Sequence, residues 1–317
     1  MRRLLLATAV LSLFTGSAHA GVLDLASRMG NANIFTLHDF NATSSDVEGA
    51  VVAGGSVNVS GYSINANNQD AFGKAGVGND GYAVVARGDV TLKNGSINNG
   101  LTYAGGKTSV SSASIAGISA TEPIDFDLTA NYYKLLSTNL SQLAGTGSVS
   151  KLYSGVLVTG GGSGNVDIFN VASSMFATSS SWTLSKLTPG QTLIFNVSGA
   201  LGTFNNGGIS FQPLAGYNVL FNFFEAGSVD VRGVIGSVLA PNAAVTANWG
   251  VINGNVVVDT WASTVQINAN HYFKPVEVAG LQVPTIKPPV ADVPEPASTA
   301  LALAGLAALG FTRRKRA

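Results

Sequence analysis

Residues whose types and spacing could support catalysis are few and scattered in this chain. His38 and His271 are the only histidines beyond residue 20, whereas a zinc site needs three or four N, S or O ligands at defined spacing. Asp46 and Glu48 lie two positions apart and would share one face of a strand, where two carboxylates could act as acid and base in glycoside hydrolysis. Solvated carboxylates at a strand edge are far commoner. We therefore expect no catalytic residue, no metal site and no cofactor.

Two glycine-rich stretches have some features of phosphate-binding loops. Gly105-Gly106-Lys107-Thr108 ends like such a loop, but Leu101 occupies the position of the first glycine that the motif requires. Residues 160–164 are more typical of a corner between two strands, since no paired acid follows in a β-α-β context. Neither stretch predicts nucleotide binding, and the chain is not expected to be an enzyme.

The N-terminus predicts export. Arg2 and Arg3 precede an apolar run, and Ala18-His19-Ala20 offers the small residues that signal peptidase needs. We expect cleavage after Ala20, with Ala18 and Ala20 as the recognised residues. A retained N-terminal anchor is the alternative, but the apolar run is short.

The C-terminus combines an acidic proline motif, an apolar run and a cluster of positive charge. Val293-Pro294-Glu295-Pro296 precedes an apolar run of about 14 residues, which is below the roughly 20 that span a bilayer comfortably as a helix. A transient membrane stop therefore suits this run better than a permanent anchor. The cations that resist translocation are Arg313, Arg314, Lys315 and Arg316.

This tail resembles the PEP-CTERM sorting signal of Gram-negative bacteria. The resemblance rests on the motif, the apolar helix and the basic end together. It implies recognition by an exosortase, a membrane enzyme similar to cysteine transpeptidases, with cleavage near Val293 to Pro296. An ordinary C-terminal tail anchor is the alternative.

The net charge of the body differs from that of the whole chain, because both ends are basic. The chain has 17 Lys and Arg and 17 Asp and Glu, but six of the cations and one anion lie in the removable ends. Residues 21–293 keep 11 cations and 16 anions, a net charge of −5. A nucleic-acid binder needs a basic stripe, so that class of partner is excluded. Because the chain has no cysteine, an exported body must be held by its core and its backbone ladders.

Short apolar stretches recur along the body. Val85-Ala86 recurs as Tyr103-Ala104, and Val234-Ile235-Gly236-Ser237-Val238 recurs at positions 252–256, with the same offset along the chain in both cases. Val52 and Val85 are spaced more widely than this, so insertions must interrupt the repeat. Self-similarity of this kind predicts a mainly β solenoid, in which each coil buries its face against its neighbours. A β-sandwich or jelly roll is the alternative.

One segment has helical periodicity instead. Pro123, Asp125 and Asp127 suit a helix N-terminus, and Gly145 lies just beyond a plausible end. We expect one amphipathic helix along the side of the β stack. Its predicted apolar stripe consists of Leu128, Tyr132, Leu135, Leu136, Leu140 and Leu143.

The body itself resembles a known family. Asp46-Val47-Glu48-Gly49 leads to Ala53-Gly54-Gly55, and residues 236–245 read Gly-Ser-Val-Leu-Ala-Pro-Asn-Ala-Ala-Val. On these residues the chain resembles the choice-of-anchor A domain, over residues 31–275. The resemblance implies an adhesin-like protein without an established reaction. The C-terminal coils also resemble bacterial ice-binding proteins, which pair a right-handed β-helix with one long flanking helix; this likeness implies architecture alone, because fold does not carry function.

The polar residues of the strands predict ladders on the outer faces of the stack. Ladders of Ser, Thr and Asn suit hydrogen bonding to polysaccharide. Trp182, Trp249 and Trp261 could stack on sugar rings, although packing in the core or at an edge is the expected fate of each. Ice binding favours flat Thr-rich faces, whereas the strands here offer isolated threonines such as Thr91 and Thr102.

The chain is thus expected to have four parts. They are a signal peptide (residues 1–20), a choice-of-anchor A-like β-helix domain (21–281), a proline-rich spacer with the PEP motif (282–296), and a hydrophobic sorting helix with a basic tail (297–317).

The predicted function is adhesin-like and non-catalytic. We expect an exported protein of a Gram-negative bacterium, held transiently at the inner membrane by its C-terminal helix and then delivered to the cell surface or extracellular matrix. Signal peptidase, an exosortase, and exopolysaccharide of a biofilm or another surface ligand are the expected partners. A carbohydrate- or ice-binding module is the alternative, and a polysaccharide-degrading enzyme is a remote one.

Overall fold

The computed structural model describes residues 20–30, 32–67, 81–162, 164–204 and 209–285. The chain divides into two units, residues 1–284 and 285–317, and the fold described below is that of the first. Ala18, the motif Val293 to Pro296, the apolar run and the basic cluster lie outside the described residues.

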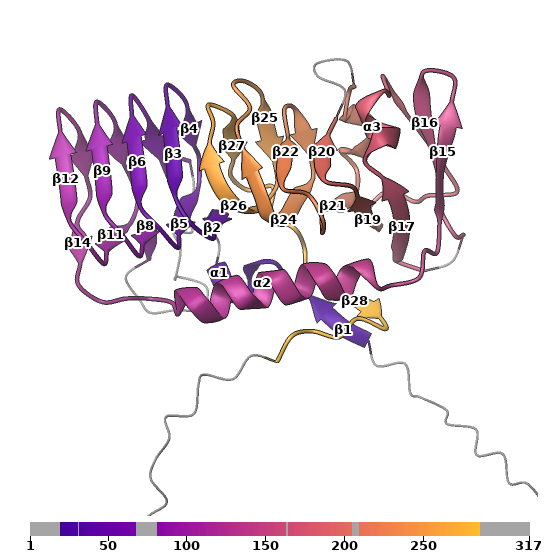
Figure 1. Ribbon diagram of the computed structural model, residues 1–317, viewed down its shortest axis with the longest axis horizontal. Coiled ribbons are helices and arrows are strands. Elements are labelled where there is room, and N and C mark those ends of the chain that lie inside the picture. Colours follow the sequence, from indigo (N-terminus) through magenta and orange to yellow (C-terminus); the bar gives the residue numbers. More distant parts are fainter. Residues whose placement is uncertain (1–19, 31, 68–80, 163, 205–208, 286–317) are drawn as a thin grey trace, which may run out of the picture. The chain divides into compact units, whose positions relative to one another are not determined.

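The body is mainly β, built from parallel strands. In its N-terminal part a unit of three short strands repeats, and each strand pairs in parallel with its counterpart in the next unit (Figure 1). In chain order these strands are β2 (Ala32–Thr36), β3 (Phe40–Thr43), β4 (Asp46–Val47), β5 (Ala50–Ala53), β6 (Val57–Ser60), β7 (Ser63–Ile64), β8 (Tyr82–Ala86), β9 (Val90–Lys93), β10 (Ser96–Ile97), β11 (Leu101–Ala104), β12 (Thr108–Ser111), β13 (Ser114–Ile115) and β14 (Ile118–Ser119).

The long helix α2 (Phe126–Ser141) then leads to a second series of strands, several of them longer. β24 and β26 each pair with both layers of the stack, because one long strand replaces two short ones. The elements are β15 (Ser148–Leu152), β16 (Gly155–Thr159), β17 (Val166–Ala172), α3 (Ser174–Ala177), β18 (Trp182–Ser185), β19 (Thr192–Ser198), β20 (Leu201–Thr203), the 3-10 helix η1 (Gln212–Leu214), β21 (Asn218–Asn222), β22 (Ser228–Asp230), β23 (Val234–Ile235), β24 (Ser237–Val245), β25 (Val251–Asn253), β26 (Val256–Ala262) and β27 (Gln266–Asn268).

The two series meet in the middle of the sheet. β26 pairs with β24 on one side and with β2 and β3 on the other, with Val256 opposite Ile34 and Trp261 opposite Phe40. β2 and β3, which come early in the chain, therefore lie beside β26, the last long strand of the second series (Figure 1). We call this junction between β26 and the β2–β3 pair the seam.

The two ends of the body also lie together. β1 (Ala20–Leu23) pairs antiparallel with β28 (Val276–Ala279) in a separate two-stranded sheet, and Ala20 lies opposite Ala279. The short helix α1 (Ala26–Met29) follows β1 and contacts α2 through the hydrogen bond from Ser27 Oγ to Tyr132 Oη, 3.2 Å long. The predicted cleavage bond after Ala20 is therefore part of β1.

Burial distinguishes the sheet layer beneath α2 from the layer that faces solvent. Every residue of β2, β5 and β8 is buried, since one side of these strands faces the core and the other is covered. Phe35 of β2 packs against Tyr133 of α2, with ring centroids 5.6 Å apart. In β3 and β9, by contrast, buried and exposed residues alternate strictly. The solvated side of this second layer is the place where polar ladders can form.

An asparagine ladder, buried at Asn196 and Asn222 and exposed at Asn170, docks α2 on the C-terminal part of the sheet. Asn170, Asn196 and Asn222 lie opposite one another in β17, β19 and β21. Asn196 donates to Asn170 and Asn222 donates to Asn196, both at 3.0 Å. Their side chains also donate to backbone carbonyl groups, Asn196 and Asn222 to those of Leu140 and Ser137 in α2 and Asn170 to that of Leu143 just beyond the helix.

The helix and the ladder match because their repeats have nearly the same length. Three helical residues rise about 4.5 Å, and neighbouring strands lie about 4.8 Å apart. A carbonyl group at every third helical residue can therefore meet one asparagine per strand.

The predicted repeat and helix are confirmed. Val85 lies opposite Tyr103 and Val234 opposite Ile252, as their equal offsets along the chain predict, and Val52 lies opposite Val85 across the expected insertion. The helix begins after Asp125, whose Oδ1 accepts a 2.9 Å hydrogen bond from the N–H of Leu128.

One position of the predicted helical stripe is wrong. Leu135 is 48% exposed, whereas Tyr133 and Ser137 are buried. The asparagine ladder fixes which carbonyl groups face the sheet, and this orientation turns Leu135 toward solvent.

Candidate binding surface

The outward-facing residues of β3, β6, β9 and β12 form two rows on the solvated layer. The strand register places Asn41, Asn58, Thr91 and Ser109 side by side, and likewise Thr43, Ser60, Lys93 and Ser111. The rows continue across the seam, where Ala262 lies opposite Asn41. We call the following residues the ladder surface: Asn41, Thr43, Asn58, Ser60, Thr91, Lys93, Ser109, Ser111, Asn248, Ala262 and Thr264.

The ladder surface is hollowed and almost uncharged. A shallow depression of about 550 Å³ runs over β3, β6, β9 and the end of β26. Asn58 Nδ2 donates to Asn41 Oδ1 at 3.0 Å, and Thr264 Oγ1 donates to the carbonyl oxygen of Asn248. Lys93 carries the one charge on this surface. Because strands repeat every 4.8 Å or so, the surface is a periodic array of neutral hydrogen-bonding groups.

An exposed tryptophan lies next to the ladder surface. Trp249 follows Asn248 in the corner after β24, and the guanidinium carbon of Arg232 lies 4.8 Å from the centroid of its ring. Arg232 is held in turn by Asp230, through Nε to Oδ1 at 2.8 Å and a second contact from Nη2 to Oδ2. The hydrogen bond that Arg232 donates to Asp230 raises the pKa of Arg232, so this guanidinium stays charged. These residues line a depression of about 280 Å³ together with Thr246 and Asn248.

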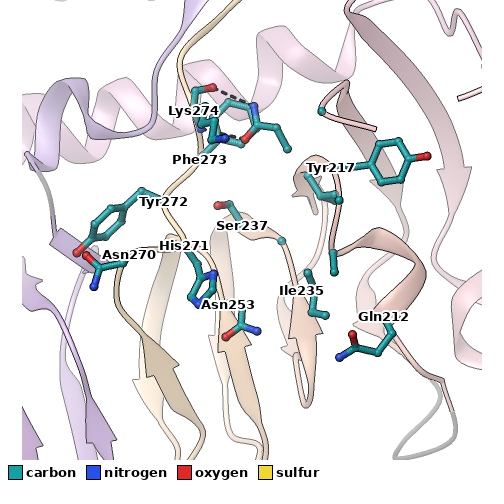
Figure 2. Close-up of a pocket in the computed structure, with 16 residues that line it drawn as sticks. Gln212, Tyr217, Ile235, Ser237, Asn253, Asn270, His271, Tyr272, Phe273 and Lys274 are labelled. Atoms are coloured by element: carbon teal, nitrogen blue, oxygen red, sulfur yellow. Dashed lines mark hydrogen bonds between the residues drawn. The ribbon is translucent and has the colours of Figure 1, made fainter. Parts of the chain in front are cut away.

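A third hollow, of about 420 Å³, lies at another corner of the stack (Figure 2). Gln212, Asn253 and His271 are among its lining residues. The Asn218 side chain in its wall is engaged in two hydrogen bonds to the backbone of Lys274. It accepts from the N–H of Lys274 and donates to the carbonyl oxygen of the same residue, both at 2.9 Å. The described residues that line this hollow include no carboxylate, so they offer His271 no acidic partner.

The two histidines lie apart. His38 Nδ1 is 2.7 Å from Asp259 Oδ1 on an exposed part of the surface, and His271 lies at the hollow of Figure 2. Among the residues that the structure describes, no group of three or more His, Asp or Glu side chains could hold a metal ion.

Asp46 and Glu48 have different environments. Burial raises the pKa of Asp46, and the neighbouring charge of Glu48 raises it further. Glu48 itself ties neighbouring units together: its Oε1 accepts from Asn67 Nδ2 at 2.6 Å and its Oε2 from the backbone N–H of Ala269 at 3.0 Å. The Glu48 carboxylate is thus engaged on both oxygens.

The two glycine-rich stretches are corners between strands. Residues 105–107 join β11 to β12, and the N–H of Lys107 donates to Asp89 Oδ1 at 2.7 Å. Residues 160–165 join β16 to β17, where Gly162 and Gly164 have positive φ angles of 79° and 99°. Both corners confirm the structural interpretation of these glycines.

The aromatic and threonine predictions are corrected in two places. Trp182 and Trp261 are buried as expected, at 5% and 0% exposure, but Trp249 is 51% exposed. Thr102 is fully buried, so of the two threonines considered Thr91 alone is displayed. The sequence motifs did not predict that Asp230 and Arg232 belong to a surface site. The signal that could have found them is the repeat, which puts Arg232 about one unit before Trp249 on a neighbouring corner.

Comparison with known proteins assigns the body and the tail separately. Residues 26–269 match the family model described as "Putative Ice-binding-like adhesive domain". The chain belongs to this family. Residues 292–316 match the PEP-CTERM protein-sorting motif, which implies processing by an exosortase and an exported, surface-located protein. Neither the curated proteins nor the solved structures contain a match to the chain.

The remaining sequence predictions fall outside what these findings test. The choice-of-anchor A designation is not the family that matched. Within the described part of the chain, no helix has the length and apolar character required to cross a bilayer. The predicted sorting helix of residues 297–311 lies outside that part.

Proposed function

We propose that this chain is a non-enzymatic adhesive protein that contacts its target through the ladder surface. The ice-binding-like adhesive family and the sorting motif support its location at the cell surface. The observation that carries the proposal is the pair of exposed polar rows, which keep one register across β3, β6, β9 and β12. A rigid array of this kind presents many hydrogen-bonding groups without ordering cost at the moment of contact.

The architecture behind this surface is a right-handed β-helix with α2 along one side. Parallel pairing of successive three-strand units at fixed register supports this description. Each unit contributes one rung to the ladder surface, so the length of the stack sets the length of the array.

The expected route to the surface uses both ends of the chain. Signal peptidase would cleave after Ala20, with Ala18 as the other recognised residue. The exosortase would act near the motif Val293, Pro294, Glu295 and Pro296, while the basic cluster holds the tail at the inner membrane of a Gram-negative cell. Residues 282–296 would serve as spacer between the body and this tail. The basic cluster consists of Arg313, Arg314, Lys315 and Arg316.

The target that fits best is a hydroxyl-rich polymer of the extracellular matrix. Neutral amide and hydroxyl side chains form most of the ladder surface, with Lys93 as its one charge. Ice is the second candidate, because the regular strand spacing also suits a lattice of ordered water. A polysaccharide-degrading enzyme would need a pair of carboxylates at its cleft, and the depression over the ladder surface has none among its lining residues.

Large charged substitutions in the rows test the proposal. The assay measures how strongly cells that display the full chain attach to matrix polymer. We expect Asn58→Arg and Thr91→Arg each to reduce this attachment by roughly tenfold or more, because blocking a central contact costs over about 1.4 kcal/mol of binding free energy. Asn131→Arg, on an exposed position of α2, is the matched control. Circular dichroism melting of each variant checks that the fold is kept.

The same variants decide between the two targets. Thermal hysteresis in the wild-type protein that is lost in Asn58→Arg would assign ice as the target. Attachment that survives both ladder substitutions would contradict the proposed surface altogether.

A further inference from the structure

Trp249 is the one tryptophan of the three that the body does not bury. Trp261 and Trp182 are 0% and 5% exposed, whereas Trp249 is 51% exposed. An aromatic side chain of this kind buries roughly 150–250 Å² when it is fully packed, and sites that bind small ligands are lined mainly by hydrophobic and aromatic side chains. Its position in a corner next to the ladder surface therefore needs a physical explanation.

The ring is held in a fixed orientation without a ligand. Arg232 stacks over it at 4.8 Å, and the side chains of Arg232 and Asp230 are only 18% and 27% exposed in their ion pair. A side chain that is ordered in advance loses little entropy when it binds.

A glycine allows the two corners to approach each other. Gly250 has a φ of 120°, and a Cβ atom there would lie 2.9 Å from the backbone N of Gly233 and 3.0 Å from Arg232 Cα. Only glycine can therefore follow Trp249 at this separation of the two corners.

The charge balance of the site indicates a neutral ligand. The depression around Trp249 is lined by Asp230, Arg232, Thr246, Ala247, Asn248 and the tryptophan itself. Its one cation is paired with its one anion, so no net charge remains to attract an anionic ligand. An apolar ring face beside hydroxyl and amide groups is complementary to a ligand with both C–H and O–H groups on one rigid ring.

We propose that Trp249, oriented by Arg232, is a stacking platform for one pyranose ring of a neutral polysaccharide. Asn248 lines both this depression and the one over the ladder surface. A polymer chain can thus stack one sugar on Trp249 and continue along the polar rows. The inference rests on the proposed adhesive function, and it adds the class of ligand and the residue that contacts it.

Binding of the processed full chain to defined polymers tests the platform. Hydroxyethyl cellulose, galactomannan and dextran are the neutral probes and alginate is the anionic one, each included in a native gel for affinity electrophoresis. We expect Trp249→Ala to weaken binding to at least one neutral polymer by roughly tenfold, as for a central aromatic contact. Trp249→Phe keeps a ring and should stay within about threefold of the wild type.

A matched control and a spectroscopic readout accompany this measurement. Tyr153→Ala removes another exposed aromatic side chain, 96% accessible and located in the turn between β15 and β16, and should bind as the wild type does. Because Trp182 and Trp261 are buried, acrylamide quenching of tryptophan fluorescence reports mainly on Trp249. The bound neutral polymer should reduce that quenching, and Trp249→Ala should abolish the polymer-dependent change.

Several results would overturn the platform. They are wild-type affinity in Trp249→Ala, unchanged quenching in the presence of polymer, binding to alginate alone, or no binding to any of the four polymers. If ladder substitutions still abolish attachment in such a case, the adhesive function stands and the platform fails. If Trp249→Ala weakens polymer binding while Asn58→Arg and Thr91→Arg leave attachment intact, the platform stands and the ladder surface is wrong as the contact site.

Discussion

Asp46 is a half-buried carboxyl group at the start of β4, two positions from Glu48. Burial is the main cause of its raised pKa, and the charge of Glu48 adds to the effect. The hydroxyl group of Tyr62 lies near enough that Asp46 contributes to the raised pKa of this buried tyrosine. The site thus disfavours the ionised form of Asp46, which is a structural cost near neutral pH.

This cost gives a pH-dependent prediction. A folded-state pKa above the unfolded value means that the folded chain holds the proton more tightly, so stability falls as the pH rises through the folded pKa. Asp46→Asn should therefore raise the melting temperature at pH 7. Below the ordinary carboxyl pKa of about 4, where Asp46 is protonated in both states, the difference should vanish.

Thermal melts of wild type and variant between pH 3 and pH 8 check this expectation. Glu277→Gln removes an exposed carboxylate from β28 and is the control for a general effect of net charge. A melting temperature of Asp46→Asn equal to or below that of the wild type at pH 7 would contradict the role assigned to burial.

Exposure of individual aromatic residues could be predicted only in part from the sequence. Trp261 precedes Ala262 and Ser263 in the same buried–exposed–buried alternation as Phe40, Asn41 and Ala42, so its burial follows from strand periodicity. Trp249 belongs to a corner, where no periodicity applies. Its exposure depends on the neighbouring corner at Arg232, which is a contact between units and has no local signal.

At the scale of elements, α2 illustrates both success and failure. Its N-terminus follows from Asp125, a good capping residue before an apolar run, and the structure shows that cap. Its rotation about its own axis does not follow from hydrophobicity. Leu135 is apolar and yet exposed, because the asparagine ladder under the helix requires the carbonyl groups of residues 137, 140 and 143 to face the sheet.

The ladder itself has a sequence signature with a different period. Ile168-Phe169-Asn170-Val171 recurs as Ile194-Phe195-Asn196-Val197, and Asn222 occupies the same place after one more step of equal length. The phenylalanines of this repeat also stack, with Phe169 and Phe195 ring centroids 4.9 Å apart. The shorter period that relates Val85 to Tyr103 does not apply here, because longer units replace the short ones of the N-terminal part.

The central asparagine should be the most costly one to replace. Asn196→Leu removes the donor to the carbonyl of Leu140 and the partners of Asn170 and Asn222, and it leaves the buried groups of Leu140 and Asn222 without these bonds. We expect a loss of about 2–4 kcal/mol in the free energy of unfolding, since each unsatisfied buried group costs about 1–3 kcal/mol. Urea denaturation measures the loss, and hydrogen exchange at the amides of residues 137–143 locates it.

Asn58→Leu is the matched control for this substitution. Asn58 also bonds to a ladder neighbour, Asn41, but in contact with solvent. Water can satisfy the polar groups that remain, so the change in stability should stay within roughly 1 kcal/mol. Equal losses in the two variants would show that the buried hydrogen bonds of Asn196 are not what holds α2.

At the scale of the whole body, the order of units along the chain differs from their order in space. The repeat in the sequence predicts that successive units stack in chain order, which holds from β2 to β14 and again from β17 to β26. The connection through α2 carries the chain from β14, at one end of the sheet, to the opposite end at β17, and the second series then stacks back toward the first unit, so that β26 pairs with β2 and β3. Repeat analysis cannot reveal this seam, because it joins Phe40 and Trp261, which are distant in sequence and belong to no common repeat.

The seam joins the two halves of the body by strand pairing and by a buried aromatic contact. The rings of Phe40 and Trp261 stack with centroids 6.0 Å apart and an angle of 8° between their planes, and both side chains are fully buried. Truncation of a buried tryptophan costs about 3–5 kcal/mol. Trp261→Ala should therefore lower the free energy of unfolding of the entire body by this amount, in a single cooperative transition.

Trp249→Ala provides the comparison, because it deletes the same side chain from an exposed corner and should cost no more than about 1 kcal/mol. Urea denaturation followed by far-ultraviolet circular dichroism compares both variants with the wild type. A biphasic curve in Trp261→Ala would mean that the two halves unfold independently and that the seam does not couple them. A loss no greater than that of Trp249→Ala would mean that the contact between Phe40 and Trp261 contributes little to the stability of the body.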